Sequence, residues 1–133
     1  MFSASDANEL IPALEVLIRD LQGQAAELRT RIQDLVRADQ SLDAMHLAEI
    51  VQRYPDLRPN TARMAEIASQ IQTLGCFLKD IDQGLVDFPG EVGDDVVFLC
   101  WQFGEPRVTT WHPINGGFAE RQPIPGAPKT YLN

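Results

Sequence analysis

Leucine residues recur through the first third of the chain with the period of an α-helix. They follow one another at intervals of three, four or seven, in a stripe made by Leu10, Leu14, Leu17, Leu21, Leu28 and Leu35. Positions with these spacings lie on one face of a helix. Ser3 followed by Asp6 matches a capping box, so the helix is expected to begin near Ala4. Pro12 cannot donate a hydrogen bond to the carbonyl of Asn8, which predicts a kink near Asn8.

A second apolar row lies one position along from the leucines and repeats every seven residues, at Ile11, Ile18, Ala25 and Ile32. The apolar face is therefore wider than a two-stranded coiled coil requires. Because one partner helix covers one row, we expect self-association to bury the second, most simply in a four-helix dimer. The alternative is that residues 42–50, which form a short amphipathic helix, fold back over this row and leave a monomer.

A second long helix is expected to start near Asn60 or Thr61, after a connector that is interrupted by Pro55 and Pro59. Its apolar positions alternate at three and four residues, at Met64, Ile67, Ile71, Leu74, Leu78 and Ile81. We expect Gly84 to end this helix. Two long helices joined in this way should lie antiparallel to each other.

Beyond Gly84 the apolar period changes from 3.6 residues to two, as in a β-strand. Turn residues divide this part of the chain into short pieces that suit an antiparallel sheet. The predicted pieces are an apolar run at 85–88 ended by Pro89-Gly90, a strand at 96–101, a turn at Gly104-Glu105-Pro106, a return strand at 107–112 and a short strand at 118–124.

These elements predict an α+β fold, in which a long antiparallel helical hairpin, coiled-coil-like, is capped by a small C-terminal antiparallel β-sheet. We expect one domain over residues 1–133. The hairpin would occupy 1–84 with its connector at 38–60, and the β region 85–124. The proline-rich end at 125–133 is expected to be a flexible tail.

Composition narrows the classes of function. The formal charge of -8 and the pI near 4.6 argue against nucleic acid and acidic membranes as partners. No stretch approaches the roughly 20 apolar residues of a membrane span. Two cysteines are too few for a disulfide framework, and the first residues lack the basic start of a signal peptide. We therefore expect a cytoplasmic protein with reduced thiols.

Several strings in the chain carry a resemblance when they are taken together. They are Gly-Leu-Val-Asp-Phe-Pro at 84–89, Leu-Cys-Trp at 99–101, Gly104-Glu105, Trp111-His112 and Gly117-Phe118. With these strings the chain resembles, over nearly its whole length, the bacterial family called domain of unknown function 2203. The run Glu120-Arg121-Gln122 departs from the family pattern, where a smaller or more basic run is expected. The resemblance implies a small bacterial protein without an assigned activity.

Acidic residues are dense between the second helix and the strands, and they are the first candidates for a metal site. They are Asp80, Asp82, Asp87, Glu91, Asp94, Asp95 and Glu105. Oxygen ligands of this kind bind Ca²⁺ or Mg²⁺, but the spacing does not match a calcium loop, and solvated turns are the simpler interpretation. Asp87 is different because it lies in an apolar run. Its carboxylate is expected to be buried and to need a partner, either His112, Arg107 or backbone N–H groups.

Cys100 and His112 raise the question of an activated thiol, or of a metal site completed by Asp87, Glu105 or another chain. The competing interpretation is that Cys100 is a small core residue. A two-residue turn would place Cys100 and His112 on opposite faces of the hairpin, and a three-residue turn on the same face. Pro106 favours the longer turn, because it cannot donate to a ladder. The same-face arrangement points Trp101 and Trp111 toward the helices.

The leading hypothesis from the sequence is a non-enzymatic, homo-oligomeric interaction protein. Its helices would bind a protein partner, and its sheet end would form a polar pocket from Asp87, Cys100, Trp101, Glu105, Trp111 and His112. The alternative is a small enzyme or metal-binding protein that holds a divalent metal with Asp87, Cys100, Glu105 and His112. No organic cofactor is indicated.

Overall fold

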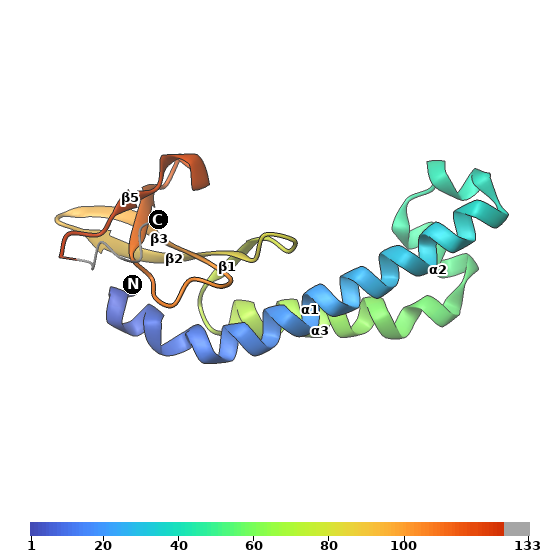
Figure 1. The fold of residues 1–133 in the computed structure, drawn as a ribbon, viewed down its shortest axis with the longest axis horizontal. Coiled ribbons are helices and arrows are strands. Elements are labelled where there is room, and N and C mark those ends of the chain that lie inside the picture. The colour runs from blue at the N-terminus through green and yellow to red at the C-terminus, as the bar shows by residue number, and fades with distance from the viewer. Residues whose placement is uncertain (127–133) are drawn as a thin grey trace.

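The computed structural model describes residues 1–126 and has an α+β fold with two distinct ends (Figure 1). A helical hairpin forms one end, and a five-stranded antiparallel sheet, with its strands in sequence order, covers the N-terminal part of the first helix. The helices are α1 (Ala4–Ala38), α2 (Leu47–Arg53) and α3 (Arg58–Thr73). The strands are β1 (Phe77–Asp80), β2 (Leu85–Val92), β3 (Asp95–Gln102), β4 (Thr110–Pro113) and β5 (Gln122–Pro123).

The start of α1 is as predicted. The Ser3 hydroxyl accepts a hydrogen bond from the Asp6 backbone N–H at 3.0 Å, and the Asp6 carboxylate accepts one from the Ser3 N–H at 3.2 Å. The helix continues through Pro12 without ending. Figure 1 shows its axis bending in the blue, N-terminal third, the part of the helix in which the kink is expected. The side chain of Asn8 accepts a hydrogen bond from the Val108 N–H at 2.6 Å, which joins this part of α1 to the chain beyond β3.

The second apolar row of α1 is partly covered within the chain. Ile11 and Ile18 are buried in one core with residues of the sheet. At the far end of the hairpin, Ile32 packs in a second cluster with Ile50 and Leu57, so the fold-back of the connector is correct there. Ile11 and Ile18 are therefore not available to a partner helix, whereas Ala25 and Ile32 are half-buried and line a surface groove. Self-association stays a prediction without that support.

The predicted end of the second helix at Gly84 is wrong. The helix α3 begins at Arg58 and ends at Thr73, and Gly75 follows with a φ of 92°. This left-handed conformation suits glycine and ends helices. The next residues form β1, from which Leu78 still packs against the core. The apolar spacing continued past the helix because both a helix and a strand can bring Leu78 to the same core.

The predicted end of the next apolar run at Pro89-Gly90 is also wrong, since β2 continues to Val92. The carbonyl of Pro89 accepts a hydrogen bond from the Phe2 N–H at 2.7 Å. In an antiparallel strand the N and O of one residue point to the same side. The missing donor of Pro89 therefore points away from β3, and the ladder to β3 is intact. A Cβ on Gly90 would lie 2.8 Å from both Leu99 Cγ and Phe2 O, so this close approach requires glycine.

The register of the central hairpin is the one expected for the longer turn, with Phe98 opposite His112 and Cys100 opposite Thr110. The return strand is shorter than predicted, because residues 107–109 leave the ladder and β4 starts at Thr110. The strand expected at 118–124 is reduced to the two residues of β5, after a 3₁₀ turn at Phe118–Glu120. Most of the predicted tail, 127–133, lies outside the described residues.

Candidate functional site

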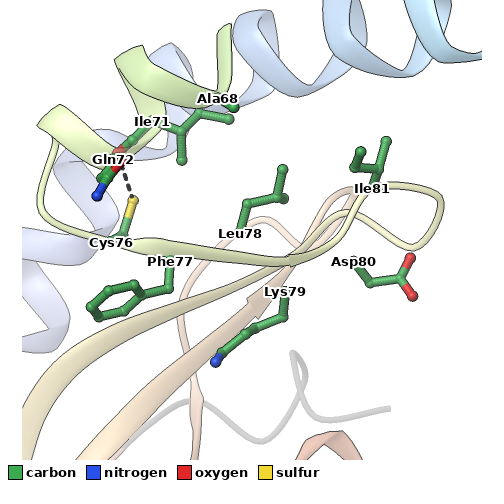
Figure 2. Close-up of a pocket in the computed structure, with 9 residues that line it drawn as sticks. All are labelled: Ala68, Ile71, Gln72, Cys76, Phe77, Leu78, Lys79, Asp80 and Ile81. Atoms are coloured by element: carbon green, nitrogen blue, oxygen red, sulfur yellow. Dashed lines mark hydrogen bonds between the residues drawn. The ribbon is translucent and has the colours of Figure 1, made fainter. Parts of the chain in front are cut away.

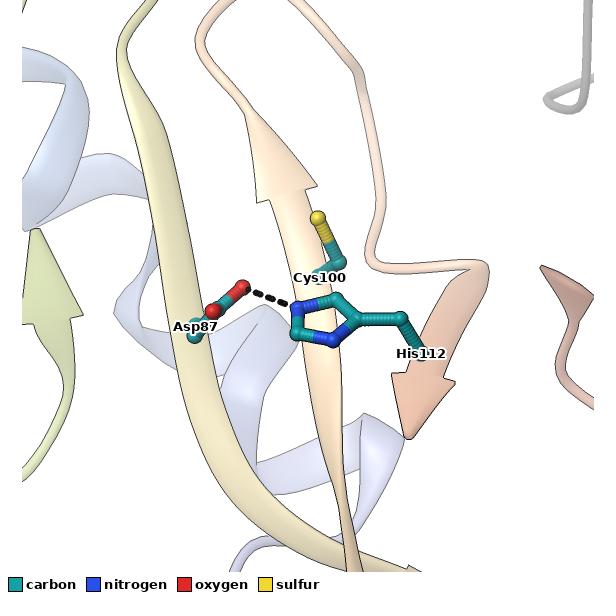
Figure 3. Close-up of side chains that lie close together, drawn as sticks. All are labelled: Asp87, Cys100 and His112. Atoms are coloured by element: carbon teal, nitrogen blue, oxygen red, sulfur yellow. Dashed lines mark hydrogen bonds and ion pairs between the residues drawn. The ribbon is translucent and has the colours of Figure 1, made fainter. Parts of the chain in front are cut away.

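Three side chains that can bind metals meet on the face of the sheet that points away from the helices. They are Asp87 on β2, Cys100 on β3 and His112 on β4, and Figure 3 shows them side by side on adjacent strands. Their donor atoms all lie within 4.8 Å of one another. The exposed fractions are 3%, 2% and 3%, so the cluster is almost completely buried. In residues 1–126 it is the only group of three or more such residues that are this close.

Strand alternation explains how these residues come together. On β2, Val86 and Phe88 are buried in the core against the helices, so Asp87 between them points to the other face. Asp87 is opposite Cys100 in the β2–β3 ladder, and His112 lies two residue pairs further along in the β3–β4 ladder, on the same face as Cys100. The cluster depends on the pairing of β2 with β3 and on the pairing of β3 with β4. Only the register of β3 with β4 was predicted from the sequence.

A pocket of about 240 Å³ opens onto the three donor groups. Its other walls are Lys79, Leu85, Gly116, Gly117 and Phe118. The last three belong to the segment that follows β4 and covers this face. This segment is held by hydrogen bonds from the Gly116 N–H to the Pro113 carbonyl at 2.9 Å and from the Gly117 N–H to the Glu120 carboxylate at 2.7 Å. The site is therefore buried but has a cavity beside it.

The hydrogen bonds of His112 place a hydrogen on Nδ1. Nδ1 lies 2.8 Å from the Pro113 carbonyl oxygen, and Nε2 lies 3.0 Å from Asp87 Oδ1. A carbonyl oxygen only accepts, so Nδ1 carries a hydrogen. The contact between Nε2 and Oδ1 then needs one further proton, which either group can hold. With the Cys100 thiol protonated, the three groups together are electrically neutral.

Cys100 is not an activated nucleophile. Burial raises the pKa of the Cys100 thiol to about 12, and the negative charges of Asp87 and Glu105 raise it further, whereas Arg121 acts in the opposite direction. A thiol with this pKa is protonated at neutral pH. In addition, Nε2 of His112 is already hydrogen-bonded to Asp87 and does not act as a base for the thiol.

Glu105, which was also a predicted ligand, lies outside the group of three donor residues and is bound by Arg121. Both of its carboxylate oxygens accept hydrogen bonds from Arg121 Nη2 at 2.7 Å, and one of them also accepts from the Gln102 N–H at 2.6 Å. Arg121 also donates through Nε to Thr110 Oγ1 at 2.8 Å. These contacts attach the segment after β4 to the edge of the site. Sequence reasoning missed this role of Arg121, although the unexpected run at 120–122 was a signal.

The tryptophans lie on the other face, as predicted. Trp101 has an exposed fraction of 0% and lies in the core between the sheet and α1, and its indole N–H donates to the Glu105 carbonyl at 2.9 Å. Trp111 is half-buried and packs against the same core. Neither side chain belongs to the walls of the pocket beside the cluster.

The other candidates stay apart from the site. Asp80 accepts a hydrogen bond from the Gln83 N–H, and Asp82 pairs with Arg29 at an exposed position. Cys76 lines a separate groove of about 490 Å³ between α3 and β1 (Figure 2). Burial raises the pKa of its thiol to about 11, and its sulfur lies 3.6 Å from the Ile71 carbonyl oxygen. Cys76 is thus a second buried thiol without the metal-binding neighbours of Cys100.

Comparison with known proteins places the chain in a family. A family model described as "Uncharacterized conserved protein (DUF2203)" matches residues 1–124, and the chain belongs to this family. The family has no assigned function. No curated protein and no solved structure matches the chain. None of the helices in residues 1–126 combines the length and the apolar character needed to cross a membrane.

Proposed function

For this member of an uncharacterised family, we propose that Asp87, Cys100 and His112 bind one divalent transition-metal ion, for which zinc is the best match. The observation that supports the proposal is the convergence of three different donor groups beside a cavity. Thiolate sulfur, imidazole nitrogen and carboxylate oxygen are the ligands of protein zinc sites. Ca²⁺ and Mg²⁺ prefer oxygen ligands alone, so they match this set poorly.

The spacing of the donor atoms suits such an ion. Around a tetrahedral zinc, neighbouring sulfur and nitrogen ligands lie about 3.5 Å apart, given bond lengths near 2.3 and 2.0 Å. Asp87 Oδ1 and His112 Nε2 are already 3.0 Å apart, and no pair of donor atoms exceeds 4.8 Å. The donor separations thus lie close to those that a tetrahedral ion requires.

The hydrogen bond on the far side of His112 supports the same role. A histidine that binds a metal usually donates its other ring N–H to a carbonyl or carboxylate, which holds the ring in place. His112 donates from Nδ1 to the Pro113 carbonyl at 2.8 Å and thereby directs Nε2 at Asp87 and Cys100. Binding would replace the proton between Nε2 and Oδ1, together with the thiol proton.

Charge balance favours the ion in this buried position. A divalent cation with one thiolate, one carboxylate and a neutral imidazole has no net charge. An uncompensated charge would be costly in a site that is at least 97% covered, as the exposed fractions of 2–3% imply. The release of two protons on binding keeps the site neutral in both states.

The ranking of the hypotheses changes with the structure. The interaction hypothesis rested on an uncovered apolar row, and Ile11 and Ile18 of that row are buried under the sheet. The metal hypothesis needed an acidic side chain near Cys100 and His112, and Asp87 supplies it. Three protein ligands with one open position are typical of catalytic zinc sites, so the enzyme alternative stays within the same proposal.

The test is the metal content of protein purified without chelator, followed by titration of the metal-free protein with Zn²⁺. We expect one ion per chain, and Cys100→Ser or His112→Gln should lower the affinity at least tenfold. Cys76→Ser is the matched control, because Cys76 is equally buried but has no histidine or aspartate in a cluster with it. Equal affinity in the Cys100→Ser and Cys76→Ser variants, with both folded by circular dichroism, would refute the site.

A further inference from the structure

We infer that the open metal position takes the carboxylate or phosphate group of a small organic anion, and that Lys79 holds this anion. The inference rests on the proposed metal site and names the class of ligand that would share it. It follows from the composition of the pocket walls and not from the three metal-binding residues themselves.

The cavity is larger than a metal-bound water requires. Its volume is about 240 Å³, whereas one water molecule occupies about 30 Å³ in the liquid. Asp87, Cys100 and His112 form one wall, so a ligand in the cavity lies directly against the donor atoms. The space suits a molecule of several heavy atoms with one oxygen at the metal.

Among residues 1–126, Lys79 is the only lysine or arginine in the walls of this cavity. Figure 2 shows its side chain on the opposite side of β1 from Leu78, which points to the helices. The ammonium nitrogen lies 5.7 Å from the centre of the Phe98 ring and 5.9 Å from that of Phe77, within the range of cation–π attraction. No carboxylate in residues 1–126 forms an ion pair with Lys79. The two rings therefore position a charge that is available to a ligand.

The remaining walls favour an organic molecule over a bare inorganic ion. Leu85 and Phe118 present apolar side chains, and Gly116 and Gly117 present none. The N–H groups of both glycines are already used in hydrogen bonds within the covering segment, so they do not form an anion nest. The polar recognition of the ligand is thus left to the metal and to Lys79.

The charges agree with an anion as well. The metal with its three ligands is neutral. Asp87, the only carboxylate that residues 1–126 place in the walls, is already counted among those ligands. Lys79 adds one positive charge. A ligand with one negative charge makes the filled pocket neutral, whereas a cationic ligand would be repelled by the like charge of Lys79.

The experiment uses the full chain loaded with Co²⁺, whose visible absorption reports changes at the open position. Benzoate, acetate and inorganic phosphate are the probes, and benzamide is the neutral counterpart of benzoate. We expect a saturable spectral change with at least one anion, tightest for benzoate, and none with benzamide. Lys79→Gln should weaken anion binding at least tenfold and leave the anion-free cobalt spectrum unchanged. Lys79→Arg should restore much of the affinity.

Arg53→Gln is the control for a general loss of positive charge, because Arg53 lies on α2 at the far end of the hairpin. It should bind the anions like the unaltered protein. A cobalt spectrum that no anion changes, or that anions change equally in Lys79→Gln, would overturn the inference and leave the metal site intact. Failure of the protein to bind Co²⁺ or Zn²⁺ at all would overturn the metal site and this inference with it.

Discussion

The two faces of the sheet are built on opposite principles. The face toward the helices is apolar, and its central residues Val86, Phe88, Leu99 and Trp101 are buried in one core with α1 and α3. The face away from the helices is also buried at its centre, but there it holds Asp87, Cys100, Thr110 and His112. Burial of the first face stabilises the fold through the hydrophobic effect. Burial of the second has to be offset by hydrogen bonds.

This difference separates the part of the molecule that holds the fold from the part that can carry chemistry. A polar cluster on a buried face is not needed for a stable sheet, because apolar residues of similar size are often at least as stabilising. The strands nevertheless place a carboxylate, a thiol and an imidazole together under a covering segment that Arg121 attaches through Glu105 and Thr110. The polar face is therefore where function is to be sought.

The largest expected effect is on stability and comes from a truncation on the apolar face. Trp101→Ala removes a side chain with an exposed fraction of 0%, and it should lower the free energy of unfolding by about 3–5 kcal/mol. Urea denaturation measures the change. Phe98→Ala on the other face, where the ring is half-buried, is the matched truncation and should cost about 1–2 kcal/mol. Equal losses for the two variants would contradict the division between the faces.

The second effect is on the polar face and concerns pH. Because burial raises the pKa of Cys100 to about 12, the thiol is protonated in the metal-free protein at neutral pH, and metal binding must release its proton. A rise in pH makes this release easier. If only the thiol proton is released, metal affinity should increase about tenfold per pH unit. Release of the proton between Asp87 and His112 as well would bring the increase to about a hundredfold.

Chelator competition at a series of pH values gives this slope, and the protons released can be counted directly in weakly buffered solution. Cys100→Ala removes the thiol proton and should reduce the slope by one proton in any residual binding. A metal affinity that is independent of pH would show that the thiolate is not a ligand.

The smallest effect compares two neighbouring threonines. The hydroxyl of Thr109 is buried and, within residues 1–126, has no hydrogen-bond partner, whereas the hydroxyl of Thr110 donates to the Cys100 carbonyl at 3.0 Å and accepts from Arg121. Thr109→Val should raise the free energy of unfolding by about 1 kcal/mol, and Thr110→Val should lower it by about 1–2 kcal/mol. Thermal denaturation of the two variants side by side measures both changes. Effects of the same sign would contradict this comparison.

Local signals in the sequence were sufficient for the helix start, and the predicted register of the hairpin is also correct. The capping box joins Ser3 to Asp6, and residues three apart in sequence must be close in space when a helix begins. The register with Cys100 opposite Thr110 is as predicted, but the three-residue turn from which it was inferred is not, because β3 ends at Gln102 and β4 starts at Thr110. This register places Cys100 and His112 on one face of the sheet.

Distant contacts decided the elements that were predicted wrongly. The apolar series through Leu74, Leu78 and Ile81 suits a helix, but pairing of Phe77 with Asp87 in the β1–β2 ladder makes the second part a strand. Pro89 reads as the end of a strand, yet its missing donor points toward Phe2 and leaves β3 undisturbed. The periodicity of a short segment indicates which of its residues face the core. It does not indicate whether the segment reaches that core as a helix or as a strand paired with another strand.

Distant contacts also decided which residues form the cluster. Sequence alone indicated that Asp87 needed a buried partner and left His112, Arg107 and backbone N–H groups as alternatives, and it added Glu105 to the ligands. The alignment of β2 with β3 brings Asp87 to Cys100 and His112, while Arg121 holds Glu105 apart. A helix cap depends on residues a few positions apart, so the sequence determined it. Strand partners are separated by long stretches of chain, and only the packing of the whole fold chose among them.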